Sequence, residues 1–188
     1  MTRVRSLELR LVGIPLVRPF RTSFGESTEK VCVLARVETD DAFGGGECVS
    51  DVEPNFSEEW NEGAWGVISD FLAPAMFAAG DVQAERLGSV FSFVRGHPMA
   101  KATLLNAVLD AELRAQGRSL ASYLGAVRDR VECGVSVGIV PSTDVLLEQV
   151  EGYLAEGYRR TRRTRPDRAR PRGRTRAVSY THLTLPTN

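Results

Sequence analysis

Two early segments of the chain alternate between apolar and polar residues. In residues 4–17 and 30–39, apolar side chains recur at nearly every second position, as in a strand with one buried face. Residues 40–45, DDAFGG, form a turn, and residues 46–49 begin a return strand. Together they predict a three-stranded antiparallel meander. Its expected inner face carries Val4, Leu7, Leu9, Leu11, Val31, Val33, Ala35 and Val37.

Helical periodicity replaces this alternation after residue 56. Ser57 is the expected N-cap of a first helix, Glu58 and Glu59 suit the positive end of its dipole, and Pro74 is expected to end it. A second helix is expected between a cap at Asp81 and Phe93. These two helices and the one that follows them predict an α+β domain.

The third helix has the clearest pattern. Pro98 suits its first turn and Gly117 its end. A short helical turn is expected over Ser119–Leu124. The stripe expected to face the core consists of Ala100, Leu104, Ala107, Val108 and Ala111.

A new pattern begins at residue 131. Residues 131–140 are rich in β-formers, Pro141-Ser142 is a turn and N-cap, residues 144–156 have helical spacing, and Gly157 can terminate that helix. A strand followed by a helix is the opening of a β/α repeat. One repeat leaves a strand edge and apolar faces uncovered. We therefore expect a poorly soluble or partly unfolded chain.

The charge is divided between two unlike pieces. Residues 1–158 hold 14 Lys+Arg and 23 Asp+Glu, whereas residues 159–188 hold ten arginines and one acid, so the overall charge is zero. Without apolar periodicity, residues 159–188 are predicted to be disordered. Such a tail would bind nucleic acid only non-specifically, through charge. A small module with an Arg-rich nucleic-acid-binding tail is therefore an alternative function.

The remaining composition excludes several classes. The three cysteines lack CxxC spacing, which disfavours zinc and a disulfide framework; Cys32 and Cys48 either face each other on paired strands or are reduced, half-buried thiols. Two histidines disfavour a histidine-based triad. No apolar run approaches the ~20 residues of a membrane span, and the first residues do not resemble a signal peptide. These features predict a cytoplasmic protein without membrane contact.

Four segments carry a resemblance to a known family. They are PLVRPFRTSFGE (15–26), GGGECVSD (44–51), GHPMAKATLLNAVLDAELRAQGRSLASYLGAVRDRV (96–131) and ECGVSVGI (132–139). In this order and spacing they resemble the N-terminal portion of the o-succinylbenzoate synthase / N-succinylamino acid racemase family of the enolase superfamily. Leu105-Asn106 departs from the family helix, which usually has Glu and then an apolar residue.

The resemblance implies a domain organisation. Residues 1–128 would form the capping domain of the superfamily, an antiparallel three-stranded meander plus helices. Residues 129–158 would form the first β/α unit of a truncated (β/α) barrel. Residues 159–188 would be a disordered tail, and we hypothesise that it is out of frame, because an Arg/Pro/Thr-rich, lysine-free run is what a shifted GC-rich gene tends to encode.

The resemblance also implies a chemistry. The parent enzyme would abstract a proton alpha to the carboxylate of a small-molecule substrate, with Mg²⁺ stabilising the enediolate. A synthase then expels water to give o-succinylbenzoate, a menaquinone precursor, whereas an N-acylamino acid racemase returns the proton to the other face. The parent is expected to be a homo-oligomer.

The chain departs from the family where that chemistry would begin. After Gly157-Tyr158 the family continues with a Lys-x-Lys strand, but residues 159–164 read RRTRRT. The metal ligands and the opposite-face lysine belong to later strands. We therefore predict no catalytic residue, no metal ligand, no bound Mg²⁺ and no turnover in this chain.

The expected substrate-binding residues are Arg21, Thr22, Ser23, Phe24 and Ser136. The first four are expected in a loop that covers the active-site mouth and reads the substrate side chain; the alternative is an ordinary strand connection. Ser136 is expected to offer its hydroxyl near the substrate carboxylate, or else to be a tolerated small residue. His97 is expected to cap a helix or lie in solvent, and Lys101 to form a salt bridge rather than act as a base.

Overall fold

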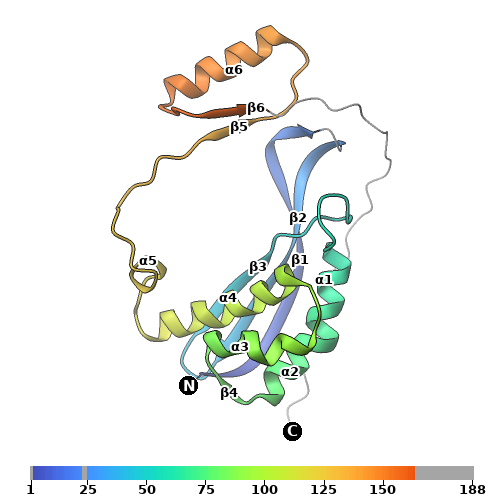
Figure 1. Ribbon diagram of the computed structural model, residues 1–188, viewed down its shortest axis with the longest axis vertical. Helices are drawn as coiled ribbons and strands as arrows, with labels where there is room; N and C mark the ends of the chain where they lie inside the picture. The colour runs from blue at the N-terminus through green and yellow to red at the C-terminus, as the bar shows by residue number, and fades with distance from the viewer. Residues whose placement is uncertain (1, 23–24, 164–188) are drawn as a thin grey trace. The chain divides into compact units, whose positions relative to one another are not determined.

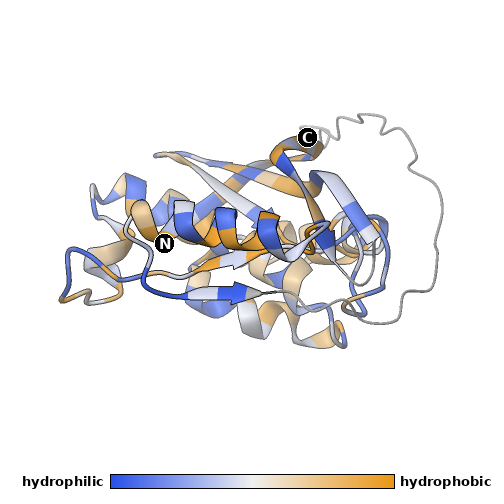
Figure 2. Ribbon diagram, turned by 90° about the horizontal axis from the view of Figure 1, so that it is seen from above, coloured by the Kyte–Doolittle hydropathy of each residue, from blue (hydrophilic) through white to orange (hydrophobic). Residues whose placement is uncertain are grey.

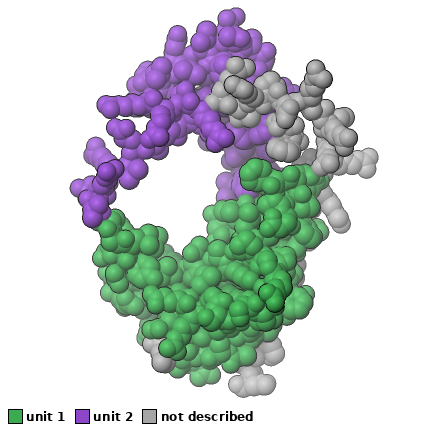
Figure 3. Space-filling model, viewed as in Figure 1, with its two compact units in different colours: residues 1–13, 31–126, 177–188 green, residues 14–30, 127–176 purple. Residues whose placement is uncertain are grey.

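The computed structural model describes residues 2–22 and 25–163. Within that range the chain forms two compact units (Figure 3). Residues 2–13 and 31–126 belong to the first. Residues 14–22, 25–30 and 127–163 belong to the second. None of the helices in the described part is long and apolar enough to cross a membrane.

The first unit is built on a four-stranded sheet (Figure 1). Its strands are β1 (Thr2–Thr22), β2 (Gly25–Thr39), β3 (Phe43–Cys48) and β4 (Asp81–Val82), in the order β3-β2-β1-β4. The β2–β3 and β1–β4 pairs are antiparallel. The predicted meander is confirmed, and β4 extends it by one short strand.

The strands of this sheet run further than the apolar pattern suggested. Arg21 and Thr22 belong to β1 and not to a loop, so the predicted loop is wrong at these two positions. Strand pairing uses backbone groups and continues where both side-chain faces are exposed, as most residues of 25–30 are. Such a segment has no alternation of apolar and polar residues from which a strand could be predicted. Ser23 and Phe24 lie outside the described residues.

The predicted inner face of β2 is confirmed. Val33, Ala35 and Val37 are buried, and they pair with Cys48, Gly46 and Gly44 of β3. Because Val33 is the partner of Cys48, Cys32 points to the opposite side of the sheet from Cys48. The two thiols therefore do not face each other. Both are reduced thiols and are fully buried, not half-buried.

The clearest predicted helix is present as α4 (Pro98–Ala115), which packs on β3 (Figure 1). All five predicted stripe residues are buried. Gly44 and Gly46 allow the close approach, because a Cβ at either position would overlap the helix backbone. At the other end Gly117 adopts a φ of +60°, and the Arg118 N–H donates to the Leu113 carbonyl, which closes the helix. The short helix α5 (Leu120–Tyr123) follows, with Ser119 as its cap.

The first predicted helix differs at both ends. It starts as α1 (Asn61–Val67), so Ser57 is not its cap; the Ser57 hydroxyl instead donates to the Glu59 carbonyl at 3.1 Å. Pro74 does not end it either. A π-helical turn, η1 (Ile68–Leu72), leads into α2 (Ala73–Ala78), which has Pro74 in its first turn. The wider π turn accommodates a proline that an uninterrupted α-helix would exclude.

The second predicted helix is shorter than expected. Asp81 pairs with Arg3 in the sheet and is not the cap. The helix α3 covers Ala84–Val90 and continues as a 3₁₀ turn, η2 (Phe91–Phe93). Its Ala84 N–H donates to the Glu112 carboxylate at 3.2 Å. A side chain of α4 thus satisfies the start of α3.

The second unit contains one β/α/β sequence (Figure 1). It consists of β5 (Val135–Val137), α6 (Thr143–Ala155) and β6 (Thr161–Arg163), with β5 and β6 parallel. Ser142 caps α6, as predicted, and Gly157 follows it with a φ of +95°. In both units the helices carry hydrophilic and hydrophobic residues in alternation (Figure 2), as expected for helices that cover one side of a sheet.

The strand β6 corrects the prediction that residues 159–188 are disordered. The backbone of Thr161–Arg163 pairs with Val135–Val137, although the side chains of Thr161 and Arg162 are exposed. Disorder was inferred from missing apolar side chains, but a strand added at a sheet edge needs only backbone partners. The rest of the predicted tail, residues 164–188, lies outside the described residues.

Candidate functional site

The parallel strands of the second unit have a carboxyl end and an amino end, and the two ends differ in their suitability for ligand binding. Because β5 and β6 are parallel, their carboxyl ends lie together, and in α/β folds ligands bind at the carboxyl ends of the strands. Ser136 is in β5 and is exposed. Its partner in β6 is Arg162. The carboxyl end of β5 is therefore the place to look for a site.

The end of β1 docks at this point. The Ile139 N–H, two residues beyond β5, donates to the Arg21 carbonyl at 2.9 Å. A Cβ built on Gly138 would lie 3.2 Å from the Arg21 carbonyl oxygen and 3.4 Å from Phe20 Cδ2. Two predicted site segments, Arg21–Thr22 and Ser136, are thus brought into one unit near the same strand end.

The described side chains at this end are polar. Arg21 Nε lies 3.5 Å from Glu26 Oε2, and both side chains are about half exposed. The Thr22 hydroxyl donates to the Gly25 carbonyl at 3.3 Å. A guanidinium and hydroxyl groups can bind a carboxylate. They do not accept a proton from a carbon acid at neutral pH.

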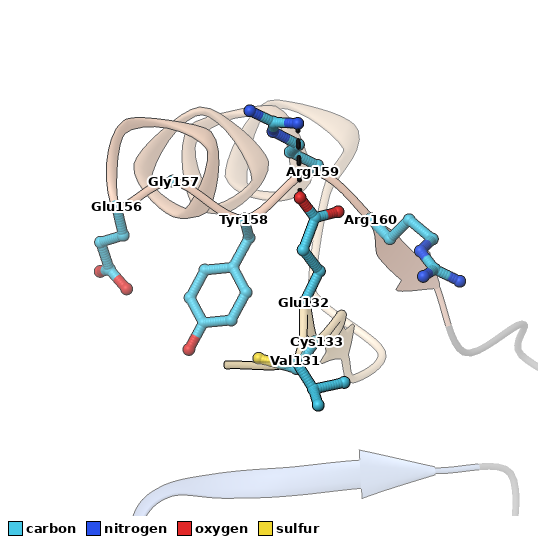
Figure 4. A pocket seen from close by; sticks show the side chains of 8 residues that line it. All are labelled: Val131, Glu132, Cys133, Glu156, Gly157, Tyr158, Arg159 and Arg160. Atoms are coloured by element: carbon cyan, nitrogen blue, oxygen red, sulfur yellow. Dashed lines mark hydrogen bonds and ion pairs between the residues drawn. The ribbon is translucent and has the colours of Figure 1, made fainter. Parts of the chain in front are cut away.

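A hollow of this unit lies at the opposite end (Figure 4). It has a volume of about 510 Å³ and is lined by residues 131–133 and 156–160, which precede β5 and β6. Arg159 contacts Glu132 at 3.4 Å across it, and both side chains are mostly exposed. The amino ends of parallel strands are associated with stability rather than catalysis. We therefore do not place the site in this hollow.

A second hollow, of about 460 Å³, lies on the first unit against β2, β3 and α4. The Phe43 ring contacts two guanidinium groups there, with Arg36 at 4.5 Å and Arg114 at 4.8 Å from its centroid. Asp110 accepts hydrogen bonds from Gly45 N–H and Arg114, both at 2.9 Å. These contacts cover the edge of β3 and fasten it to α4.

The remaining candidates in the first unit have structural roles. His97 occupies the N-cap position of α4, but its side chain makes no capping hydrogen bond. Lys101 Nζ donates to the Val94 carbonyl at 2.6 Å instead of forming the predicted salt bridge. Among the residues that the structure describes, no group of three or more His, Cys, Asp or Glu side chains could hold a metal ion. The described residues thus do not supply the ligand set for the implied Mg²⁺.

Sequence reasoning missed Gly138 and Ile139. Gly138 contacts β1 closely because it has no side chain, and Ile139 contacts β1 through its backbone N–H. No side-chain motif reveals either contact. A glycine at the end of a strand does signal a close approach of another segment. That signal was present in the GVSVGI stretch, residues 134–139.

The comparisons with known proteins agree with this fold. The chain is 49% identical to the N-succinylamino acid racemase of Amycolatopsis sp over 156 residues, 83% of this chain and 42% of that protein. It is 39% identical to the o-succinylbenzoate synthase of Geobacillus stearothermophilus over 153 residues, 81% of this chain and 41% of that protein. A scan of protein-family models finds no match.

Solved structures support the same relationship. A member of the enolase superfamily from Listeria innocua superposes with a TM-score of 0.80 at 30% identity, covering 87% of this chain and 44% of that one. The fold thus defines a member of the enolase superfamily. More narrowly, over its aligned residues the chain belongs to the o-succinylbenzoate synthase / N-succinylamino acid racemase family. It spans less than half the length of these relatives.

Proposed function

We propose that the chain represents the capping domain and first barrel unit of an enzyme that abstracts a proton alpha to the carboxylate of a small substrate. The 49% identity to the Amycolatopsis racemase over 156 residues is the observation that carries the proposal. The β5–α6–β6 sequence supports it, because this is the arrangement with which a (β/α) barrel begins.

In this proposal the described residues bind and orient the substrate. Arg21 and Thr22 lie at the end of β1, and Ser136 lies on β5 near its carboxyl end. A guanidinium and two hydroxyls suit a carboxylate and a polar substrate side chain. In the parent family a divalent cation supplies charge stabilisation at the reacting carboxylate. The described residues offer no ligand set for it, so we assign them no step through the metal.

We further propose that residues 1–188 as written are inactive. The family expectation after Tyr158 is a Lys-x-Lys strand, whereas β6 reads Thr161-Arg162-Arg163. A guanidinium stays protonated at neutral pH and cannot accept the substrate proton. A shifted reading frame near residue 159 would account for this, and the nucleotide sequence tests it: an alternative frame should restore a Lys-x-Lys strand after Tyr158.

A chimera tests the binding and activity proposals together. Residues 1–158 are joined to the part of the Amycolatopsis racemase that follows its aligned segment. With Mg²⁺, the chimera should exchange the Cα proton of an N-succinylamino acid with solvent deuterium, whereas the 188-residue chain should not. The matched variant S136A should lower kcat/KM by about ten-fold. A folded chimera without exchange, or an active 188-residue chain, would contradict the proposal.

The same chimera separates the two family activities. The chain is more similar to the Amycolatopsis racemase than to the Geobacillus synthase, at 49% against 39% identity, which favours racemisation. Racemisation returns the proton, so the N-succinylamino acid loses optical activity without a change in mass. A synthase instead releases water and forms o-succinylbenzoate. Both products are measured in the same preparation by circular dichroism and mass spectrometry.

A further inference from the structure

We propose that Gly138 is a positioning residue, which lets the end of β1 dock on the carboxyl end of β5 and so sets where Arg21 and Thr22 stand relative to Ser136. The contact consists of one backbone hydrogen bond and one close approach. Both lie within the second unit. The inference deepens the proposed function, on which it rests for the identity of the ligand.

The close approach explains why a glycine is needed. A Cβ at Gly138 would lie 3.2 Å from the Arg21 carbonyl oxygen and 3.4 Å from its nitrogen. Gly138 does not have a positive φ, so its backbone conformation is open to other residues. Space, and not conformational freedom, is therefore what selects glycine. By contrast, a Cβ at Gly152 in α6 would meet nothing within 4 Å.

The hydrogen bond adjoins this glycine. The Ile139 N–H donates to the Arg21 carbonyl at 2.9 Å, so any side chain at Gly138 that pushes the Arg21 backbone away also lengthens this bond. This hydrogen bond should shift the docking equilibrium about five-fold towards the docked state. One added methyl group tightens the contact, and a branched side chain breaks it.

The docked segment lies close to Ser136 along β5. Ser136 and Val137 are successive residues of this strand and point to opposite sides; Ser136 is exposed, whereas Val137 is 2% exposed. Gly138 is the first residue after β5, so the β1 segment that packs against it lies at the carboxyl end of the strand that carries Ser136. The Arg21 guanidinium is held there by a 3.5 Å pair with Glu26. An exposed pair of this kind is weak, and the carboxylate of a substrate can replace it.

Residue-resolved amide exchange on the 188-residue chain tests the contact. In G138V, the Ile139 amide and those of residues 14–22 and 25–30 should exchange about five-fold faster or more. I139P removes the donor without filling the space, and it should accelerate the same residues of β1 and β2. The matched control G152A should leave all of them unchanged.

The exchange of α6 distinguishes positioning from general destabilisation. If Gly138 positions β1, the amides of α6 keep the exchange rates of the unsubstituted chain. The exchange rates of residues 14–22 and 25–30 rise. The inference is overturned if neither variant accelerates β1, or if α6 accelerates equally, since the residue would then only maintain the fold.

A kinetic measurement connects the contact to the ligand. In the chimera of residues 1–158, G138V should raise KM for the N-succinylamino acid by about ten-fold with little change in kcat. Unchanged KM together with accelerated exchange in β1 would overturn the role in binding. A chimera that is inactive even with Gly138 would instead count against the proposed function, and the exchange data would still decide the docking.

Discussion

The Glu59 carboxylate accepts a hydrogen bond from the Met99 N–H at 2.7 Å. It also accepts one from the Ala100 N–H at 3.0 Å, and its side chain is 1% exposed. The helix α4 therefore begins on a buried acid that lies 40 residues earlier in the chain. His97, the residue at the N-cap position, has a left-handed backbone, and its Nδ1 lies 3.9 Å from Glu59. A carboxylate at this end also complements the helix dipole.

Replacing Glu59 should weaken the first unit strongly. E59A leaves two buried N–H groups without acceptors, and we expect it to lower the free energy of unfolding by about 2–4 kcal/mol. E59Q keeps an acceptor and should cost less. Urea denaturation followed by the fluorescence of Trp60 and Trp65 measures both. Equal effects of the two variants would show that the charge, and not the acceptor, matters.

The close contact between β3 and α4 gives a second prediction. A Cβ at Gly46 would overlap the Thr103 carbonyl, whereas at the adjacent Gly45 the nearest atom lies 4.0 Å away. G46A should therefore destabilise the chain by about 3 kcal/mol or more. G45A should change stability by less than about 0.5 kcal/mol. Equal melting temperatures of the two variants would contradict the close packing of β3 on α4.

The pair Arg5–Asp40 gives a pH prediction. Arg5 Nε and Nη2 donate to the two Asp40 oxygens at 2.6 and 2.8 Å. These hydrogen bonds lower the pKa of Asp40 and raise the pKa of Arg5. A lowered carboxyl pKa stabilises the fold above its unfolded value, ~3.9, and this stabilisation is lost as the pH falls through the folded value.

The variant D40N should therefore be slightly less stable than the unsubstituted chain at neutral pH. The difference should shrink as the pH is lowered below ~3.9, and also at high salt, because both side chains are about half exposed. Melting temperatures between pH 2 and 7 test this. The neighbouring D41N is the control and should show no such convergence, because Asp41 forms no ion pair with any of the residues that the structure describes.

The second unit should open more easily than the first. Among its described residues Val137 is the only buried hydrophobic side chain, and α6 contains no buried residue, whereas α4 contains seven. We expect the amides of α6 to exchange at least ~100-fold faster than those of α4. The chain should also bind a hydrophobic dye such as ANS. A single sharp melt without dye binding would contradict this.

Local sequence signals predicted the local features of the fold. The 3.6-residue spacing gave α4, and Ser119, Ser142 and Gly157 marked helix ends, because each acts on backbone groups a few residues away. The helical spacing of residues 144–156 also predicted α6, but it did not predict how exposed the helix is. Leu147 and Leu154 are each 54% exposed, because a short sheet covers little of α6.

Features that join distant segments were not predictable in this way. Glu59 resembled a first-turn acid of its own helix, and only the tertiary fold brings it to Met99. The bond between Arg21 and Ile139 uses backbone atoms alone, so no residue type announces it. Arg21, Thr22 and Ser136 were selected through the family resemblance, and their role in binding remains a prediction. The sequence indicated the family before it indicated the contacts.

The strand β6 has a consequence for how such chains can change in evolution. Its main chain completes a ladder with β5 although its side chains depart from the family expectation. The chain after α6 is thus a position that tolerates a change of sequence. Recombination or a frameshift can attach an unrelated segment there, and the chain can still form a β/α/β unit. A chain that changes at this position can keep the β/α/β fold while it loses the side chains that a site would need.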